Sequence, residues 1–406
     1  MASTLARRGH FNFRTFEAPS QKLRVKPLFV DYLLRIQQAV SWLTVALGLS
    51  CIVHGSAVAQ PGVGFAHMEL RNPNYHKFSA PRASQLSDAS VAFTDSPSRA
   101  TKINQFLQPS DTFNRKRFWQ SAGAATIIYS AAAIGLWEAW YKNYDLEPFH
   151  TFDDRGEWLD MDKFGHAYTA YHYARWAHQG LRWSGVKRPA AVGLAVGVST
   201  LLQTTVEVMD GYSSNWGFSW SDVAMNAAGA GLFAGQELIW HDQRINVKLS
   251  SWNAKHSTAP LYPTVDGGPP SSLANRAADQ YGDTPWQRFI KDYNGQTVWL
   301  STNPWVLAGS KSPKLPWLNL AVGYSVDKVY GAYGNGWSEN GFRYSPGSSA
   351  VRQREYVFSL DIDFERIPAR SPVLKTFLHL INHFKFPAPA LINQQHEGLQ
   401  FRWLYY

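Results

Sequence analysis

The segment "DKFGHAYTAYHYARW", Asp162–Trp176, decides the fold. It consists largely of aromatic and small residues, as a buried helix does, yet it begins with an acid, a lysine and a histidine. Residues four apart lie on one face of a helix, so Asp162 and His166 share a face. Because a buried charge is costly without a partner, this helix predicts polar partners elsewhere in the chain.

Helical patterns continue on both sides of this segment. One apolar run contains twenty residues without a charge, and a later run stays uncharged until Glu207. The turn "SGVKRP" precedes that later run and puts Pro189 at the favoured first helical position. Ser219 or Ser221 is predicted to cap the last helix. The four expected helices are residues 118–137, 160–183, 189–209 and 222–241.

Further polar residues fall at the ends of these helices. Glu207 and Asp210 lie three apart at the end of the third helix, and Asp222 and Asn226 lie four apart at the start of the fourth. If the helices pack as an antiparallel bundle, these ends meet at one end of the bundle. The charges of "DKFGH" would then be the partners of the later acids.

Two interpretations of this charged cluster stay open. In the first, His166 is a general base or a metal ligand, and Glu207 and Asp222 act as acid, base or further ligands. One histidine with two or three carboxylates suits Mg²⁺, Mn²⁺ or Zn²⁺. In the second, Lys163 and His166 neutralise the two acids and fix the helix register, as a polar clamp without chemistry. The remaining members of the cluster are Asp162, Asp210 and Asn226.

The other histidines of the same helix are not expected to bind a ligand with His166. His166, His172 and His178 are six residues apart, which turns each about 120° from the last on a helix. They therefore do not form one ligand face. His172 and His178 are expected at the surface or in aromatic packing.

The N-terminus has the features of an export signal. Basic residues precede an apolar run, residues 40–53, and "HGSAVAQ" then carries an A-x-A cleavage pattern that ends at Ala59. Residues 1–59 are expected to be a signal peptide, or an N-terminal membrane anchor if they stay attached. The single cysteine, Cys51, lies in a poor lipoprotein site because the run stays apolar beyond it. Cleavage would leave no disulfide and no thiolate ligand.

Composition limits the class of partner. The 406 residues have a net charge of +9, more than half of it before residue 60, and no Lys/Arg stripe, so no nucleic-acid partner is expected. Charged residues make up only 17% and aromatic residues 15%, which favours packed or lipid-adjacent surfaces. A membrane or lipid partner is therefore expected. The mean hydropathy of −0.29 argues against a protein with most of its mass in lipid.

The rest of the chain divides by composition. Residues 60–112 are polar and rich in Ser and Pro, which predicts an extended, partly disordered lead-in. Residues 250–285 have the composition of a linker. Residues 286–406 contain the strand patterns "QTVWLSTN", "LNLAVGYSV" and "REYVFSLDIDF", one helix, and a last strand in "LQFRWLYY". The predicted fold is mainly α, a helical bundle over residues 113–249 with a smaller C-terminal α+β module.

The order of the motifs resembles the YfiM-like family of uncharacterised bacterial envelope proteins. The pattern is D-K-x-x-H, then E-x-x-D, then G-x-S-x-x-D-x-x-x-N-x-x-G, and its order is also similar to that of VanZ-like membrane proteins. The resemblance covers residues 113–249 and implies an exported or membrane-associated protein without a known reaction. In this chain the pattern falls on Asp162, Lys163, His166, Glu207, Asp210, Gly217, Ser219, Asp222, Asn226 and Gly229.

These observations predict an exported protein of the bacterial cell envelope, in the periplasm or at a membrane. Its expected role is a membrane-associated structural or lipid-handling component with a buried Asp/Lys/His/Glu cluster. The alternative is a lipid- or glycolipid-directed hydrolase or transferase, metal-dependent or not, that uses His166 and Glu207. A third possibility, a binding module, predicts a large exposed aromatic patch on the C-terminal strands.

Overall fold

The computed structural model describes residues 99–141 and 144–405. The predicted signal peptide or anchor (1–59) and most of the predicted lead-in lie outside these residues. The one part of the lead-in that the structure describes includes a helix, α2, where an extended chain was predicted. This helix is joined to the bundle by the Trp183 indole N–H, which donates a hydrogen bond to the Phe106 carbonyl at 2.6 Å.

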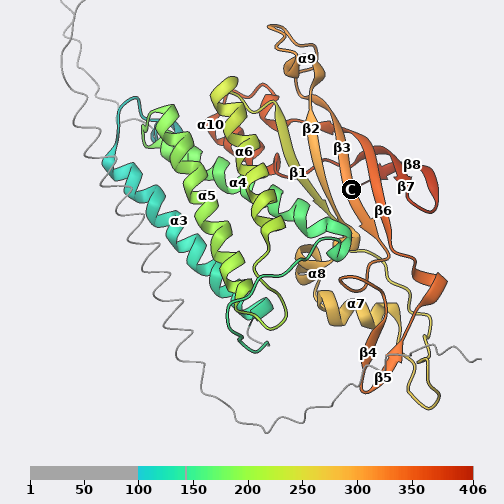
Figure 1. The fold of residues 1–406 in the computed structure, drawn as a ribbon. Helices are drawn as coiled ribbons and strands as arrows, with labels where there is room; N and C mark the ends of the chain where they lie inside the picture. Colours follow the sequence, from blue (N-terminus) through green and yellow to red (C-terminus); the bar gives the residue numbers. More distant parts are fainter. Residues whose placement is uncertain (1–98, 142–143, 406) are drawn as a thin grey trace, which may run out of the picture. The chain divides into compact units, whose positions relative to one another are not determined.

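The four predicted helices are confirmed, with ends shifted by a few residues. Asn114 and Ser219 cap the first and last of them through hydrogen bonds to backbone N–H groups. Pro189 lies in the first turn of the third, as predicted. Figure 1 shows these helices gathered on one side of the molecule. The helices of this half are α2 (Arg99–Leu107), α3 (Arg115–Leu136), a π-helical turn (Trp137–Tyr141), α4 (Met161–Trp183), α5 (Arg188–Gly211) and α6 (Trp220–Ile239).

Small residues let α4 and α6 approach closely. A Cβ atom added at Gly229 would lie 2.1 Å from the carbonyl oxygen of Ala167, so only glycine fits there. A Cβ atom added at Gly231 or at Gly235 would meet no atom within 4 Å. The small residues of "NAAGAGLFAG", residues 226–235, therefore serve close packing at one point, Gly229.

One helix in the described residues, α5, is long and apolar enough to cross a membrane. Its mean hydropathy over 18 residues is 1.4, and 39% of that window is buried inside the structure. It packs against both α4 and α6.

A six-stranded antiparallel sheet forms the other half of the structure, in the order β1-β2-β3-β6-β7-β8 (Figure 1). All the strand patterns read from the sequence are strands here. The segment after α10 also reaches β1, because the Leu249 N–H donates to the His383 carbonyl at 3.1 Å and the Lys385 N–H to the Leu249 carbonyl at 3.0 Å. The strands are β1 (Ile245–Ser251), β2 (Gln296–Thr302), β3 (Leu318–Asp327), β6 (Gln353–Ile362), β7 (Ala388–Gln394) and β8 (Gly398–Tyr405).

Strand β1 begins within residues 113–249, the range predicted to be helical, and ends beyond it. The predicted boundary at residue 249 therefore cuts through a strand of the sheet. The predicted linker, 250–285, also contains structure: Leu273, Ala277 and Tyr281 of α7 are buried against the β4–β5 hairpin. The shorter elements are α7 (Leu273–Tyr281), α8 (Pro285–Lys291), α9 (Pro304–Leu307), β4 (Trp337–Glu339), β5 (Phe342–Tyr344) and α10 (Pro372–Ile381), with short 3-10 turns between them.

Helices and sheet share one hydrophobic core. Tyr171 of α4 and Phe233 of α6 are buried in the same cluster as Val247, Val298 and Val326 of the strands. Helix α4 is central because it packs on α5 and α6 and also on β1, β2 and β3. The sheet is thus a full partner of the bundle, and the fold is better described as α+β than as the predicted mainly α fold.

Candidate functional site

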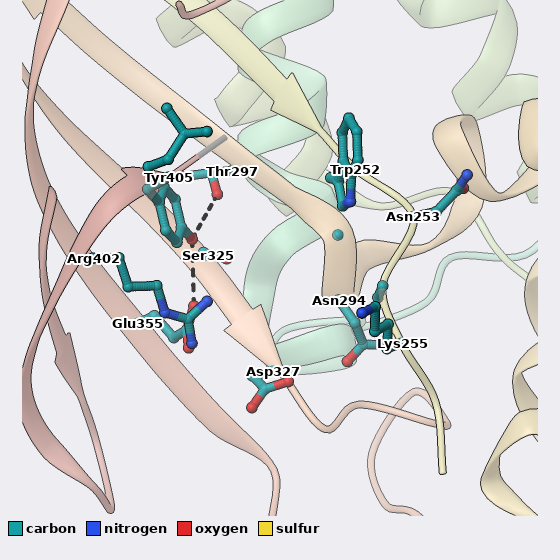
Figure 2. A pocket seen from close by; sticks show the side chains of 13 residues that line it. Trp252, Asn253, Lys255, Asn294, Thr297, Ser325, Asp327, Glu355, Arg402 and Tyr405 are labelled. Carbon is teal, nitrogen blue, oxygen red and sulfur yellow. Dashed lines mark hydrogen bonds between the residues drawn. The ribbon is translucent and has the colours of Figure 1, made fainter. Parts of the chain in front are cut away.

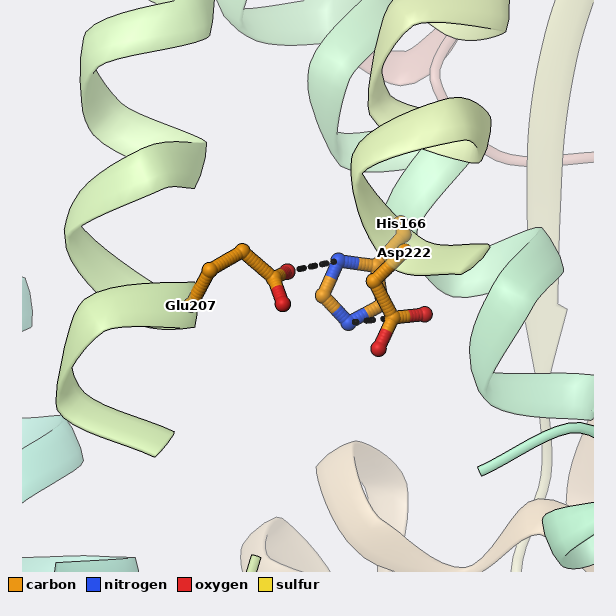
Figure 3. Close-up of side chains that lie close together, drawn as sticks. All are labelled: His166, Glu207 and Asp222. Atoms are coloured by element: carbon orange, nitrogen blue, oxygen red, sulfur yellow. Dashed lines mark ion pairs between the residues drawn. The ribbon is translucent and has the colours of Figure 1, made fainter. Parts of the chain in front are cut away.

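Three helix ends bring the predicted cluster together. His166 projects from the first turns of α4, Glu207 from the last turns of α5, and Asp222 from the first turn of α6 (Figure 3). His166 Nδ1 lies 3.4 Å from Glu207 Oε1, and His166 Nε2 lies 3.7 Å from Asp222 Oδ1. Glu207 is completely buried, at 0% exposure. The imidazole therefore lies between two carboxyl groups from two other helices.

Lys163 is the cation of the cluster. Its ammonium nitrogen lies 2.5 Å from Asp154 Oδ2, 2.8 Å from Asp222 Oδ1 and 3.1 Å from Asp162 Oδ2. Burial alone would lower the pKa of Lys163, but the three carboxylates, Asp162 first, raise it above its usual value. The side chain is thus a buried ammonium ion. Glu207, which the sequence analysis also paired with Lys163, has His166 and Asn226 as its neighbours instead.

Asp154 is a member that the sequence analysis missed. The hydroxyl groups of Ser219 and Ser221 each donate a hydrogen bond of 2.7 Å to its Oδ1 atom. Burial would raise the pKa of Asp154, but hydrogen bonds, including those from Lys163 and the two serines, hold it well below its usual range. The available signal was the acidic loop "TFDDRGEW" shortly before α4. The spacing of this loop from "DKFGH" fits no helical pattern, so the sequence alone does not indicate that Asp154 belongs to the cluster.

Asn226 links the two carboxyl-bearing helices. Its amide nitrogen donates to Glu207 Oε1 at 3.3 Å, and its amide oxygen lies 3.2 Å from His166 Nδ1. Gln203 of α5 also donates to that oxygen. Asp210 belongs to a different contact, since it accepts a hydrogen bond of 2.5 Å from the Tyr141 hydroxyl. The predicted Glu207–Asp210 pair therefore serves two separate contacts.

Burial sets the protonation of the inner part of the site. It raises the pKa of Glu207 to about 9, and the charges of Asp222 and Asp210 add to this effect. It also lowers the pKa of His166. At neutral pH the pair is therefore a protonated carboxyl beside a neutral imidazole, with no net charge. Burial likewise raises the pKa of Asp162 and that of Asp210, each to about 7.

The turn before α4 is strained. Trp158, Leu159 and Asp160 have φ values of 49°, 54° and 67°, in a region that L-amino acids other than glycine rarely adopt. The sheet holds this turn: the Tyr324 hydroxyl donates to the Leu159 carbonyl, and Arg354 contacts Asp160 at 2.9 Å. Because the turn fixes where α4 begins, it also fixes the first charges of "DKFGH".

Within residues 99–141 and 144–405, two sets of side chains have donor atoms close enough for one metal ion, with the donor atoms of each set within 4.8 Å of one another. In the set of Asp154, Asp162 and Asp222, the Lys163 ammonium already contacts all three carboxylates. The other set is His166, Glu207 and Asp222. There Glu207 Oε2 is buried and has no hydrogen-bond partner among the described residues. Asp162 Oδ1 of the first set also has no hydrogen-bond partner among these residues, but that set already holds the Lys163 cation. The second set is therefore the one that fits a divalent cation.

The two other histidines of α4 are not at the surface. His172 is 1% exposed and lies among the rings of Tyr168, Tyr171 and His383. His178 packs edge-on against Phe233. Of the two predicted environments, aromatic packing is confirmed for both.

Comparison with known proteins gives one match. No curated protein and no solved structure matches the chain. The model of one family, described as predicted periplasmic lipoprotein (DUF2279), matches residues 151–235. That segment contains Asp154 and every cluster residue predicted from the sequence. The match supports the expected resemblance at the level of an uncharacterised envelope domain, and it places the protein in the bacterial cell envelope, as predicted.

Proposed function

We propose that the protein is a membrane-associated structural or lipid-handling component of the envelope, and that its charged cluster is a polar clamp. The observation that carries this proposal is the buried Lys163 ammonium, which contacts acids from three places in the chain. Asp154 comes from the loop before α4, Asp162 from α4 itself, and Asp222 from α6. One cation thus ties the loop to both helices.

The clamp explains why an apolar helix begins with charges. Removing one partner of a buried ion pair costs roughly 3–5 kcal/mol, because the other charge stays buried without compensation. Lys163, Asp154 and Asp222 therefore define one relative position of loop and helices. Any shift along the α4–α6 contact would separate these charges.

Two cavities of the structure lie away from the cluster. One, of about 310 Å³, is lined by residues such as Trp252, Asp327 and Arg402 beside the sheet (Figure 2). Another, of about 440 Å³, is lined by residues such as Arg175 and Asp242. Neither is lined by His166, Glu207 or Asp222. A catalytic cluster needs access for its substrate, and a clamp does not.

A second candidate function is a metal-dependent hydrolase or transferase that acts on lipids or glycolipids. The specific observation in its favour is the free Glu207 Oε2 atom beside His166 and Asp222. These three side chains would hold the cation, which would supply a Lewis acid and an activated water. Glu207 would have to lose its proton for this role.

The two functions are tested by unfolding the full chain in urea, with and without EDTA. If the cluster is a clamp, Lys163→Met loses about 3–5 kcal/mol and EDTA has no effect on the parent. Lys187→Met, at an exposed lysine, is the control for removing one positive charge. If the site holds a metal, EDTA destabilises the parent but not Glu207→Ala. EDTA sensitivity of this kind, or an unchanged stability of Lys163→Met, would contradict the clamp.

A further inference from the structure

The outer face of the six-stranded sheet carries a continuous apolar row. Five residues lie directly opposite one another on five neighbouring strands, and each is between 43 and 53% exposed. The apolar row consists of Leu300, Val322, Phe358, Leu391 and Phe401.

More apolar residues flank this row on the same face. Leu320 and Leu360 pair across β3 and β6, and Tyr356 lies two residues before Phe358. All three are exposed, as is Trp403 at the end of β8, at 79%. This is the exposed patch on the C-terminal strands that a binding module predicts. Such a patch is larger than the scattered apolar residues of an ordinary surface.

The inner face of the same sheet is buried and mixes polar side chains with an apolar cluster that includes Trp299, Val357 and Ile392. Lys248 Nζ lies 2.8 Å from Asp361 Oδ2, and both side chains are fully buried. The Ser301 hydroxyl donates a hydrogen bond of 2.6 Å to the same carboxylate. A buried cross-strand row on this face consists of Thr297, Ser325, Glu355 and Gln394.

The outer face of this sheet departs from the usual order of a soluble antiparallel sheet. Such sheets place apolar residues inward and polar residues toward water. Strands that contact hydrocarbon do the opposite, with apolar residues outward and polar residues inward. The exposed outer face therefore has the pattern of a lipid-facing surface.

Helix α4 covers one end of the outer face of the sheet. Phe164 stacks on Tyr324 with ring centroids 4.4 Å apart, and Val247 and Val298 are buried beneath the helix. Val247 pairs with Leu300, the first residue of the apolar row. The apolar row therefore adjoins the surface that α4 buries, and it extends from there across strands that no described element covers.

Basic residues lie at one end of the same sheet. Leu318 begins β3 opposite Ile362, the last residue of β6, so the segments before β3 and after β6 start at the same end. Residues 303–317 carry exposed Lys311 and Lys314, and residues 367–386 carry exposed Arg370 and Lys375. The segment before β3 contains no acid. The two acids that directly follow β6, Asp363 and Glu365, are already paired, Asp363 with Asn246 and Glu365 with Arg175 and His379. A second copy of the chain would supply no excess of negative charge to this rim, whereas anionic headgroups would.

We propose that the outer face of the sheet lies against the acyl chains of a phospholipid membrane, with the basic rim at the headgroups. Exposed Trp305, in the loop between β2 and β3, is an aromatic residue of the kind that lies at such an interface. This inference rests on the membrane association proposed above and assigns it to a surface.

The test is a site-specific probe on the full chain. A fluorophore is attached to Phe358→Cys or to Phe401→Cys in a Cys51→Ser background, which removes the single natural cysteine. Glu147→Cys, at an exposed loop position, is the control. The vesicles contain phosphatidylethanolamine and phosphatidylglycerol, with or without brominated acyl chains as quenchers.

We expect brominated chains to quench the labels at positions 358 and 401 at least about threefold more than the label at 147. Lys311→Gln with Lys314→Gln should weaken the quenching at 358, and phosphatidylcholine vesicles should give less of it. If the protein floats with the vesicles but the labels at 358 and 401 stay unquenched, another segment binds the membrane. That result would overturn the assignment of membrane binding to the sheet. Labels that are shielded without lipid, in a protein that runs as a dimer, would show that a second copy covers the face.

These outcomes are separate from those of the clamp experiment. If EDTA sensitivity refutes the clamp proposal, the expected quenching of the labels on the sheet stays the same. Binding that depends on another segment keeps the proposed membrane association and refutes only the sheet. Absence of the protein from all vesicles refutes both the membrane association and the inference.

Discussion

Replacing Glu207 with glutamine tests whether this carboxyl is protonated in the folded protein. Burial, together with the charges of Asp222 and Asp210, raises its pKa from 4.5 to about 9. Between these two values the unfolded chain releases the proton and the folded chain keeps it. The folded state then binds more protons, so the stability of the parent falls as the pH rises through this window. Glutamine is close to a protonated carboxyl in shape and does not ionise.

The size of the effect follows from the shift. Each pH unit within the window changes the free energy of unfolding by about 1.4 kcal/mol. From pH 4.5 to pH 7 the neutral, buried Glu207 therefore costs the parent on the order of 3 kcal/mol. The stability of Glu207→Gln relative to the parent should rise by about this amount between pH 5 and pH 7.5, because the variant has no such cost.

The assay is urea unfolding of both proteins at a series of pH values, followed by tryptophan fluorescence. Other titrating groups, such as Asp162 and Asp210, contribute to both proteins and cancel in the difference. Glu147→Gln, at an exposed position, controls for the loss of one negative charge. A difference that does not change with pH would refute the protonated state of Glu207. If the parent instead becomes more stable than Glu207→Gln as the pH rises, a cation holds an ionised Glu207.

Three further substitutions test the packing around the cluster, each measured by urea unfolding at pH 7. Gly229→Ala should destabilise the protein by roughly 1–3 kcal/mol or more, because the added Cβ would meet the α4 backbone at 2.1 Å. The control, Gly231→Ala, adds its Cβ in open space and should be neutral or stabilising. Equal losses of stability in the two variants would contradict the close approach of α4 and α6. Ser219→Ala removes both a helix cap and a hydrogen bond to Asp154 and should cost about 1–2 kcal/mol, and an unchanged stability would argue against the cap. Tyr141→Phe leaves half-buried Asp210 without its hydroxyl donor and should cost about 1–3 kcal/mol. A smaller loss would mean that water replaces the hydroxyl.

The helices and much of the cluster could be predicted from the sequence because their signals are local. The cap at Ser219 and the apolar runs each depend on residues within a few positions of one another. The pairs Asp162–His166 and Asp222–Asn226 follow from helical spacing alone. Asp154 could not be placed in this way, because it reaches Lys163 from an irregular loop whose path depends on tertiary contacts.

The sheet shows a different limit. The alternation in "REYVFSLDIDF" defines two faces of β6 but not which one is buried. That choice depends on how α4 and the neighbouring strands pack, and the structure buries the side with Ser359 and Asp361 while Phe358 and Leu360 stay exposed. Strand β1 was also missed, because it follows α6 after only a short turn and pairs with a strand beyond the predicted linker.

The strained turn before α4 has a consequence for how the protein can be divided. Three consecutive left-handed residues cost roughly 1–2 kcal/mol each, and two of the side chains that hold them, Tyr324 and Arg354, belong to strands β3 and β6. A fragment that ended after α6 would lack both holders, and its turn would relax to an ordinary backbone and displace the start of α4. The segment that matches the envelope family is therefore not an autonomous folding unit in this chain, since strands encoded far downstream keep its first charged residues in place.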